Sequence, residues 1–438
     1  MLKEFVADNI SVGSEGHLYF AGQDTVELAK EFGTPLYLMD EDRIRHNCRM
    51  YKAAFRKHFG EGSYPLYASK SNSFMRIYQI MKEEDMGIDV VSPGELFTAL
   101  QAGYDLSRAY FHGNNKTDFD IAFGIEHKVG YFIADSMDEL DAIEDAAKNA
   151  GITQKILIRL TPGIDSHTLA AISTGQIDSK FGVVIANGQA EEALLHALSK
   201  EHIEVAGFHC HIGSQIFTED VFERAASIML EFISDMEKNH GFKTGELNLG
   251  GGYGVRYVKD DPYLNIEEKI SDVAEVINKT CSELGIERPE IRMEPGRSVV
   301  ADAGMTIYSV GSVKTIPQCR TFVSVDGSMA DNIRYALYKA KYTCLSASLA
   351  DKPHDMECSL VGRCCESGDV IQDCILLPSE TKRGDYVAVC TTGAYNYSMS
   401  SNYNRLTKPP IVMLRGGRDR YVAVKRETFD DIVRNDVI

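Results

Sequence analysis

The sequence has little positive charge to set against its negative charge: 46 Lys and Arg face 64 Asp and Glu, a formal net charge of −18 over 438 residues. A surface this acidic argues against a protein that binds nucleic acid or an anionic membrane through its field alone. No apolar run approaches the ~18 residues that a membrane span needs, and no signal-type N-terminus is present. We therefore expect a cytoplasmic protein that binds neither nucleic acid nor membrane.

Closely spaced cysteine pairs are also missing. The ten cysteines include no Cys-x-x-Cys spacing, which excludes a zinc ribbon and a thioredoxin-type redox site. The length allows one large domain or two, and excludes a small scaffold held together by disulfides. With 44% hydrophobic and 25% charged residues, the composition is that of an ordinary globular protein, and we expect its thiols to be reduced.

Short apolar, β-branched runs recur from residue 64 to residue 294. The first five begin 22 to 24 residues apart, which suits a strand, a helix and two short loops. Eight strands alternating with helices fit a (β/α)8 TIM barrel of about 250 residues, and a doubly wound sheet is the alternative because counting cannot prove closure. The predicted strands are Tyr64–Ser69, Gly87–Val91, Ala109–His112, Tyr131–Ala134, Lys155–Leu160, Glu204–Cys210, Glu246–Leu249 and Glu290–Glu294.

The segments between these strands have helical periodicity. Ser136–Asn149 and Phe222–Asn239 are two examples. Ser136 is predicted to cap its helix, and Glu139, three residues on, to complete a capping box.

After about residue 305 strand-like runs follow one another without long helices between them. Two runs near the N-terminus are similar. We expect a barrel domain at residues 40–305 and a second, all-β domain of β-sandwich or Greek-key-like β-barrel type, formed by residues 1–39 and 306–438. Its predicted strands are His17–Phe20, Pro35–Met39, Thr306–Lys314, Arg320–Val325, Asp369–Leu377, Asp385–Cys390, Ile411–Leu414 and Tyr421–Arg426.

Polar and glycine residues gather where the predicted barrel strands end. In a barrel, chemistry collects at the C-terminal ends of the strands, so this concentration is the strongest signal in the sequence. The residues at these positions are Lys70, Asp89, His112, Arg159, His209 to His211, Gly250 to Gly252, and Glu294 to Arg297.

Each of these positions has a functional and a structural interpretation. Lys70 could be a desolvated amine that forms a Schiff base, or a solvated lysine at a strand end. Gly250 to Gly252, with Gly254, could expose backbone N–H groups to a phosphate, or form a tight turn. Its place after the seventh strand favours phosphate, because barrels often bind phosphate at the loops after strands seven and eight.

His209 and His211 lie two apart, so on a strand they share a face while Cys210 points the other way. Two ligands are short of the three that a catalytic zinc site needs, so we predict no metal. We expect these histidines either to stack on a flat cofactor or to lie in the core with their hydrogen bonds satisfied. Glu294 could offer its carboxylate to a basic ring nitrogen or form a salt bridge that caps the barrel.

Two further clusters lie in the predicted β domain. Gly362 to Asp369 place the thiol of Cys365 beside the carboxylate of Glu366, although a small buried hydrophobe is the default role of a cysteine. Gly393–Asn404 is rich in Tyr, Ser and Asn, which is typical of ligand-binding loops and also of edge-strand turns.

Taken in order, these segments resemble the fold-type III pyridoxal-phosphate decarboxylases, and most closely the bacterial diaminopimelate decarboxylases. The resemblance runs from about residue 10 to about residue 430. The segments that carry it are Tyr67–Asn72, His112–Lys116, Thr174–Gly182, His209–Gln215, Leu247–Gly254, Glu294–Ser298, Cys365–Asp369 and Gly393–Asn404.

The resemblance implies a role for each matching residue. Lys70 would hold pyridoxal 5'-phosphate covalently, with Asp89 among the cofactor-binding residues, and Glu294 would keep the pyridine nitrogen protonated. His211 would stack on the ring, with His209 as second choice. The phosphate would be surrounded by Ser214, Gly251, Gly252, Gly296, Arg297 and Tyr395.

Substrate contacts would come from Arg297, Arg334, Tyr338, Glu366 and Tyr395. Cys365 matches the family's proton donor, on a loop that reaches the active site of the partner subunit, so the resemblance implies a homodimer with shared sites. It further implies decarboxylation of meso-2,6-diaminopimelate to L-lysine and CO2, the last step of lysine biosynthesis.

Three other functions stay open. The first is a related decarboxylase acting on D-lysine or D-ornithine, on lysine or ornithine, or on carboxynorspermidine. The second is a decarboxylase-like binding protein, although such a protein typically loses Lys70 or Cys365. The third is a racemase, which Glu294 disfavours because the racemases of this barrel family place an arginine there.

Overall fold

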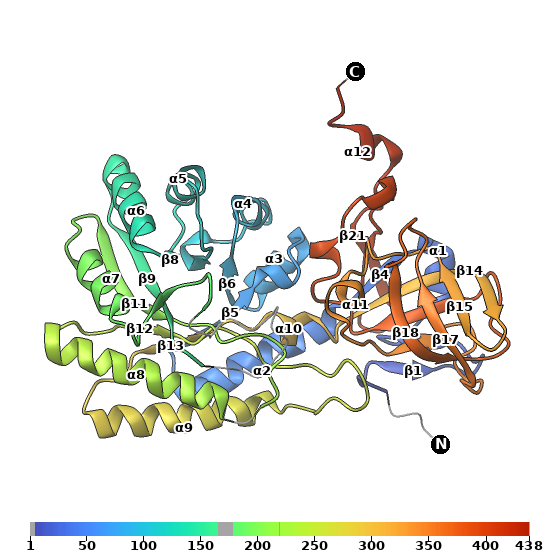
Figure 1. Ribbon diagram of the computed structural model, residues 1–438, viewed down its shortest axis with the longest axis horizontal. Coiled ribbons are helices and arrows are strands. Elements are labelled where there is room, and N and C mark those ends of the chain that lie inside the picture. The colour runs from blue at the N-terminus through green and yellow to red at the C-terminus, as the bar shows by residue number, and fades with distance from the viewer. Residues whose placement is uncertain (1–4, 165–177, 219, 438) are drawn as a thin grey trace. The chain divides into compact units, whose positions relative to one another are not determined.

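The computed structural model describes residues 5–164, 178–218 and 220–437, and the chain divides into two compact units (Figure 1). The barrel unit comprises Asn47–Gly254 and Leu264–Gly296. The β unit comprises Met1–His46, Val255–Tyr263 and Arg297–Ile438. Part of the motif-bearing segment Thr174–Gly182, namely residues 174–177, lies outside the described residues.

The expected barrel domain, residues 40–305, is wider than the observed unit at both ends. It also included Val255–Tyr263, which the structure assigns to the β unit. The physical reason is that Tyr257 is buried in the hydrophobic core of the β unit, among Tyr308, Val325 and Tyr342.

Eight parallel strands of the barrel unit form a closed ring. Each pairs with its neighbour, and β8 pairs with β9 to complete the circle, so the barrel prediction is confirmed and the doubly wound sheet is wrong. The strands, in their order around the ring, are β5 (Tyr64–Ala68), β6 (Gly87–Val90), β7 (Ala109–Phe111), β8 (Tyr131–Ala134), β9 (Gln154–Thr161), β11 (Ile203–His209), β12 (Glu246–Asn248) and β13 (Glu290–Met293). A two-residue strand, β10 (Val183–Val184), is not one of the eight ring strands and pairs with the last two residues of β9.

Helices follow the strands and cover the outside of the barrel (Figure 1). They are α2 (Glu41–Phe59), α3 (Met75–Glu83), α4 (Pro93–Gln101), α5 (Asp118–Glu126), α6 (Met137–Ala150), α7 (Gln189–Leu198), α8 (Val221–His240) and α9 (Ile266–Leu284). Among the described residues, none of the chain's helices has both the length and the apolar character needed to cross a bilayer.

The predicted N-cap of α6 is confirmed, since the Ser136 side chain accepts a hydrogen bond from the Glu139 backbone N–H. The predicted capping box is wrong. The Glu139 carboxylate accepts instead from the ammonium of Lys116, at 2.6 Å, and both side chains are buried. A buried ammonium needs a carboxylate partner more than the helix needs a second cap bond.

The interior of the barrel is polar where the strands end and mainly apolar toward the end where they begin. Leu66, Tyr110, Ile133 and Leu157 pack there as a cluster of buried side chains. Beside them the guanidinium of Arg292 lies 2.9 Å from the carboxylate of Glu246. This buried ion pair closes the end of the barrel opposite the polar strand ends.

The β unit is built on a nine-stranded mixed sheet in which the long strand β14 pairs with β4, β15 and β19. Its strands are β4 (Leu36–Asp40), β14 (Gly304–Ile316), β15 (Arg320–Val325), β16 (Cys344–Ser346), β17 (Met356–Val361), β18 (Val370–Leu377), β19 (Tyr386–Cys390), β20 (Ile411–Arg415) and β21 (Asp419–Val424). A three-stranded sheet of β1 (Ile10–Val12), β2 (Leu18–Phe20) and β3 (Gln23–Asp24) completes its strands.

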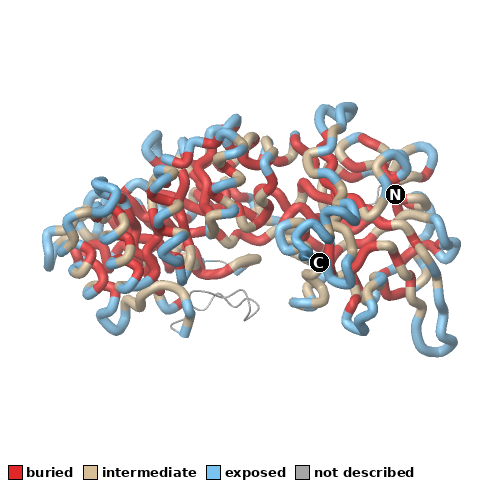
Figure 2. Tube along the Cα trace, turned by 90° about the horizontal axis from the view of Figure 1, so that it is seen from above, coloured by how far each residue is buried: buried red, intermediate tan, exposed pale blue. Residues whose placement is uncertain are grey.

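The second domain is thus confirmed as a separate, mainly β unit built from both ends of the chain. Strands β16 and β17 were not predicted, nor were its helices α1 (Thr25–Phe32), α10 (Arg297–Val300), α11 (Arg334–Tyr338) and α12 (Phe429–Val433). In both units the inner parts of the chain are buried and the outer loops exposed, as Figure 2 shows.

Candidate active site

Lys70 lies two residues after the end of β5, in the 3-10 turn Ser69–Ser71. Two hydrogen bonds hold the turn: the Tyr67 hydroxyl donates to the Asn72 carbonyl and the Ser71 hydroxyl to the Ala68 carbonyl, both at 2.8 Å. The Lys70 ammonium lies 3.7 Å from a carboxylate oxygen of Asp89, on β6. A short, braced turn therefore presents the amine beside a buried carboxylate.

Asp89 is a buried carboxylate with unused hydrogen-bonding capacity. Its side chain is 1% exposed, and burial raises its pKa. Within the described part of the chain neither of its oxygens accepts a hydrogen bond; Lys70 and His112 each lie 3.7 Å away. Buried acceptors are normally satisfied, so this carboxylate points to a polar ligand.

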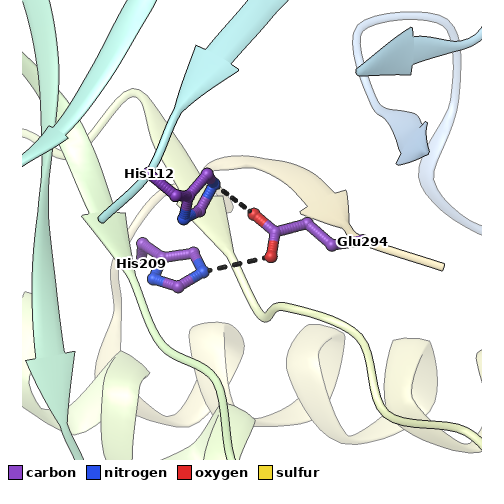
Figure 3. A group of neighbouring side chains, drawn as sticks. All are labelled: His112, His209 and Glu294. Atoms are coloured by element: carbon purple, nitrogen blue, oxygen red, sulfur yellow. Dashed lines mark hydrogen bonds and ion pairs between the residues drawn. The ribbon is translucent and has the colours of Figure 1, made fainter. Parts of the chain in front are cut away.

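Glu294 follows β13, and its carboxylate faces two neighbouring histidines, as Figure 3 shows. His112 Nε2 lies 2.9 Å from Oε1 of Glu294, and His209 Nε2 lies 3.3 Å from Oε2. The side-chain amide of Asn248 donates to Oε1 at 2.8 Å. Burial alone would raise the pKa of Glu294, but His112 and His209 outweigh it and hold that pKa well below its usual range.

The same three side chains have metal-ligand spacing, since one ligand atom from each of His112, His209 and Glu294 lies within 4.8 Å of the others. The contacts of the two histidines with Glu294 explain this spacing without a metal ion. The predicted strand through His211, on which His209 and His211 would share a face, is shorter than expected: β11 ends at His209, and His211 Nδ1 accepts a hydrogen bond from the Gly251 backbone N–H at 3.2 Å.

The glycines after β12 and β13 leave no space for side chains. A Cβ on Gly251 would lie 2.0 Å from the Glu294 carbonyl oxygen, and one on Gly252, where φ is +129°, 2.4 Å from the Gly213 carbonyl oxygen. A Cβ on Gly296 would lie 2.8 Å from the Ala68 side chain. Backbone N–H groups without Cβ atoms make a cradle for a phosphate. Ser214, half-buried, lies next to Gly213.

In the β unit, two arginines contact the same tyrosine. Arg297 donates to the Tyr257 hydroxyl at 2.7 Å, and the Arg334 guanidinium lies 3.6 Å from the centre of the Tyr257 ring. The Arg297 guanidinium also lies over the Tyr395 ring, at 4.7 Å. Tyr338, the last residue of α11, is half-buried. This cluster presents two cations, which suits a carboxylate or phosphate.

Cys365 and Glu366 lie on an exposed loop of the β unit. The Cys365 backbone N–H donates to the Asn404 side chain at 2.8 Å, which ties this loop to the Tyr-, Ser- and Asn-rich segment. The Glu366 carboxylate accepts from the Gly368 N–H at 3.1 Å. The thiol and the carboxylate are thus held in a braced loop and exposed to solvent.

The predicted site residues fall into two groups. Lys70, Asp89, His209, His211, Ser214, Gly251, Gly252, Glu294 and Gly296 lie in the barrel unit, while Arg297, Arg334, Tyr338, Cys365, Glu366 and Tyr395 lie in the β unit. Asn248 and Tyr257 were missed. Asn248 could have been found from its place at the end of a predicted strand; Tyr257 follows the glycine run in an irregular segment and carries no such signal.

The barrel residues fit pyridoxal phosphate. The Lys70 amine lies beside Asp89, whose carboxylate accepts no hydrogen bond in the described part of the chain. The glycines after β12 and β13 leave room for a phosphate, and the ionised Glu294 can pair with a protonated ring nitrogen. These are the groups that a covalently held cofactor of this kind requires.

Comparison with known proteins agrees with this fit. The profile of the pyridoxal-dependent decarboxylases, for their pyridoxal binding domain, matches residues 41–301. The diaminopimelate decarboxylase of Bacillus subtilis (strain 168) is 44% identical over 422 residues, 96% of this chain and 95% of that protein. That of Staphylococcus aureus (strain COL) is 42% identical over 427 residues, 98% of this chain and 99% of that protein.

Among solved structures, the diaminopimelate decarboxylase of M. jannaschii in complex with L-lysine superimposes with a TM-score of 0.91 at 33% identity, over 99% of each chain. The Helicobacter pylori enzyme with L-lysine gives a TM-score of 0.84 at 33% identity, over 93% of this chain and 98% of that one. The chain belongs to the family of pyridoxal-dependent decarboxylases.

Proposed function

We propose that this chain catalyses the pyridoxal-phosphate-dependent decarboxylation of meso-2,6-diaminopimelate to L-lysine and CO2. The observation that carries the proposal is the likeness to diaminopimelate decarboxylases at 42 to 44% identity along nearly the whole chain. The geometry agrees with it, because an amine for the cofactor and a pair of guanidinium groups for a carboxylate are both present.

Lys70 is the residue that holds the cofactor, and the neighbouring Asp89 steadies its amine through charge. Glu294 holds the pyridine nitrogen in its protonated form. His211, fixed by the Gly251 N–H, stacks on the ring, while His209 supports Glu294. When bound, pyridoxal phosphate supplies the electron sink for the bond that releases CO2.

The phosphate is held by Ser214, Gly251, Gly252, Gly296, Arg297 and Tyr395. The backbone N–H groups of Gly252 and Gly296 donate to its oxygens, Gly251 lines the cradle without a Cβ, and the Arg297 guanidinium supplies a positive charge. The local positive charge offsets the repulsion that an acidic protein exerts on an anionic ligand.

Substrate recognition falls to Arg297, Arg334, Tyr338, Glu366 and Tyr395. A carboxylate at the distal end of the substrate pairs with Arg334, and Glu366 holds the distal amine. Cys365 delivers a proton to the α-carbon after CO2 leaves. Because Cys365 and Glu366 are exposed, they are available to enter the site of a partner subunit, which supports a homodimer with shared sites.

The compartment is proposed to be the cytoplasm. All ten cysteines are free thiols, which agrees with a reducing environment.

The test is CO2 release from the purified holoenzyme with meso-diaminopimelate, lysine, ornithine and arginine as separate stereoisomers. Release from meso-diaminopimelate should exceed that from every other amino acid, with L-lysine as the second product. Preference for a substrate with a single carboxylate would replace the proposal with a related decarboxylase. Borohydride reduction should fix the cofactor to Lys70, and a Lys70→Ala protein that still formed the reduced adduct would refute the role of Lys70.

A further inference from the structure

Glu294 is contacted by three polar side chains from three different strand ends: His209 and Asn248 hydrogen-bond to it, and His112 Nε2 lies 2.9 Å from Oε1. His112 follows β7, His209 ends β11, and Asn248 ends β12. All three are buried, with exposed fractions of 3%, 0% and 0%. The barrel therefore places a carboxylate and its three partners in one buried layer. Figure 3 shows the carboxylate with the two histidines.

The orientation of the Asn248 amide follows from its two contacts. Its oxygen accepts from the Gly250 backbone N–H at 2.9 Å, so its NH2 group must face Glu294, to which it donates at 2.8 Å. Asn248 thereby links Glu294 to the glycine cradle.

His209 is neutral at pH 7, because burial lowers its pKa to about 3. A neutral imidazole has one N–H, and the neighbouring carboxylate assigns that proton to Nε2. This leaves Nδ1 as a bare acceptor, which agrees with its having no hydrogen-bond partner in the described part of the chain. His209 therefore donates to Glu294 and adds no charge.

Another carboxyl of the same unit, that of the half-buried Glu95, lacks such partners. Glu95, at the start of α4, accepts a backbone hydrogen bond from Val91 at 2.8 Å, but no histidine contacts it in the described structure. Burial raises its pKa to about 7. A Glu294 left in that state would be a base strong enough to compete with a pyridine nitrogen for its proton.

We propose that His112, His209 and Asn248 are positioning residues for the decarboxylation: they hold Glu294 as an ionised, weakly basic carboxylate, so that a proton on the ring nitrogen stays on the ring. This inference rests on the proposed function and on the role given there to Glu294. A carboxylate has about four acceptor positions. Asn248 on Oε1 and His209 on Oε2 occupy two of them, and His112 lies against Oε1, so a position on Oε2 is left for the ring N–H.

The consequence for the reaction is quantitative. Each unit by which the pKa of Glu294 rises shifts the ratio of ring-protonated to ring-neutral enzyme tenfold toward the neutral form. Since a neutral ring withdraws electrons less, the loss should appear in kcat rather than in KM.

The experiment compares His112→Leu and His209→Leu with the matched variants His112→Gln and His209→Gln, whose amide N–H can replace Nε2–H. Each holoenzyme is loaded with cofactor labelled with 15N in the pyridine ring, and the nitrogen shift is recorded at pH 7.5. The wild type and the Gln variants should give the shift of a protonated ring, and the Leu variants the shift of a neutral one. Leu variants that keep the wild-type shift would overturn the proposal.

A second measurement does not depend on cofactor loading. In apo-protein labelled with 13C at the glutamate carboxyl carbon, the signal lost in Glu294→Gln identifies Glu294. Its titration should move to higher pH in His112→Leu, His209→Leu and Asn248→Leu. An unmoved titration in correctly folded variants would overturn the proposal, whereas failure of the wild-type holoenzyme to release CO2 from diaminopimelate would bear only on the proposed function.

Discussion

At the scale of single residues, Tyr257 contacts the guanidinium groups of both Arg297 and Arg334 and helps to position them. Its hydroxyl accepts from Arg297 at 2.7 Å and its ring carries Arg334 at 3.6 Å. Its backbone carbonyl accepts from the Thr343 N–H, at 3.1 Å, so the tyrosine is itself anchored. Tyr257 therefore spaces the two guanidinium groups at a fixed separation.

We predict that Tyr257→Leu raises the KM for diaminopimelate about tenfold, because loss of a cation–π contact and a hydrogen bond to a charged group removes about 1 to 2 kcal/mol of arginine positioning. Tyr257→Phe, which keeps the ring, should show a smaller increase. Steady-state kinetics with diaminopimelate measures both. Tyr263→Leu, at a residue that is 82% exposed in the same segment, is the control and should leave KM unchanged. An unaltered KM in Tyr257→Leu would contradict the role.

The same residues mark how far a sequence can predict a site. Lys70 and Glu294 were found because each directly follows an apolar strand, and strand ends of a barrel converge. Tyr257 was not, because its role depends on contacts with two residues that lie 40 and 77 positions away. Asn248 lay at a strand end, but its pairing with Glu294 depends on the register between β12 and β13.

At the scale of elements, the regular spacing of strands and helices predicted all eight barrel strands. It failed in the β unit, where α1 and β17 have eight and six residues and follow no repeat. Short elements gain most of their stability from tertiary contacts, so their own sequence carries little periodic signal. Closure of the barrel also could not be predicted, because it depends on the pairing of β8 with β9, and the number of strands does not reveal which strands pair.

The ion pair at the beginning of the barrel strands leads to a stability prediction. Arg292 and Glu246 are 3% and 5% exposed, so replacing Glu246 with Leu would leave a buried guanidinium without its inner partner. We expect Glu246→Leu to lower the free energy of unfolding by about 3 to 5 kcal/mol, measured by urea denaturation.

The double variant Glu246→Leu with Arg292→Met should recover most of that loss, because an apolar pair of similar volume needs no compensating charge. Glu290→Gln is the control: Glu290 also contacts Arg292, but it is 53% exposed, so its loss should cost less. A double variant as unstable as Glu246→Leu alone would show that the charge is not the cause.

Asp331 connects two strands of the β unit and gives a pH-dependent prediction. Its carboxylate accepts from the Tyr308 hydroxyl on β14 and from the Ser328 N–H, while its backbone carbonyl accepts from Tyr37 on β4. Burial raises its pKa from 3.8 to about 7. Between these values the folded state keeps a proton that the unfolded state has lost, so the contribution of Asp331 to stability falls as pH rises.

Asp331→Asn should therefore become more stable relative to the wild type as pH increases from 4 to 7, by up to about 1.4 kcal/mol per pH unit. Urea denaturation at several pH values measures the difference, which should be constant below pH 4. A difference that does not change with pH would show that Asp331 is ionised in the folded protein throughout this range.

At the scale of the whole molecule, the net charge of −18 and the arginine cluster of the β unit have to be considered together. The overall charge disfavours the binding of polyanions, while the two guanidinium groups that contact Tyr257 provide local positive charge. Sequence composition predicted the first property; the second depends on contacts within the folded β unit. Assembly into a dimer is harder still to predict from the sequence, since it depends on the surfaces of two chains.

The proposed sharing of active sites between two subunits gives the prediction at this scale. Lys70→Ala and Cys365→Ala should each be inactive or nearly so as separate proteins, because one lacks the cofactor-holding amine and the other the proton donor. If Cys365 acts in the site of the partner subunit, a hybrid dimer contains one site with both residues intact and one with neither. Mixed variants that exchange subunits should thus recover up to one quarter of wild-type activity, since half of the dimers are hybrids and each has one working site of two.

Subunit exchange is verified by mass spectrometry with one variant isotopically labelled, and CO2 release is measured on the same sample. If exchange is complete and activity does not rise, the thiol acts within its own subunit or not at all, and the two are distinguished by whether Cys365→Ala alone retains turnover.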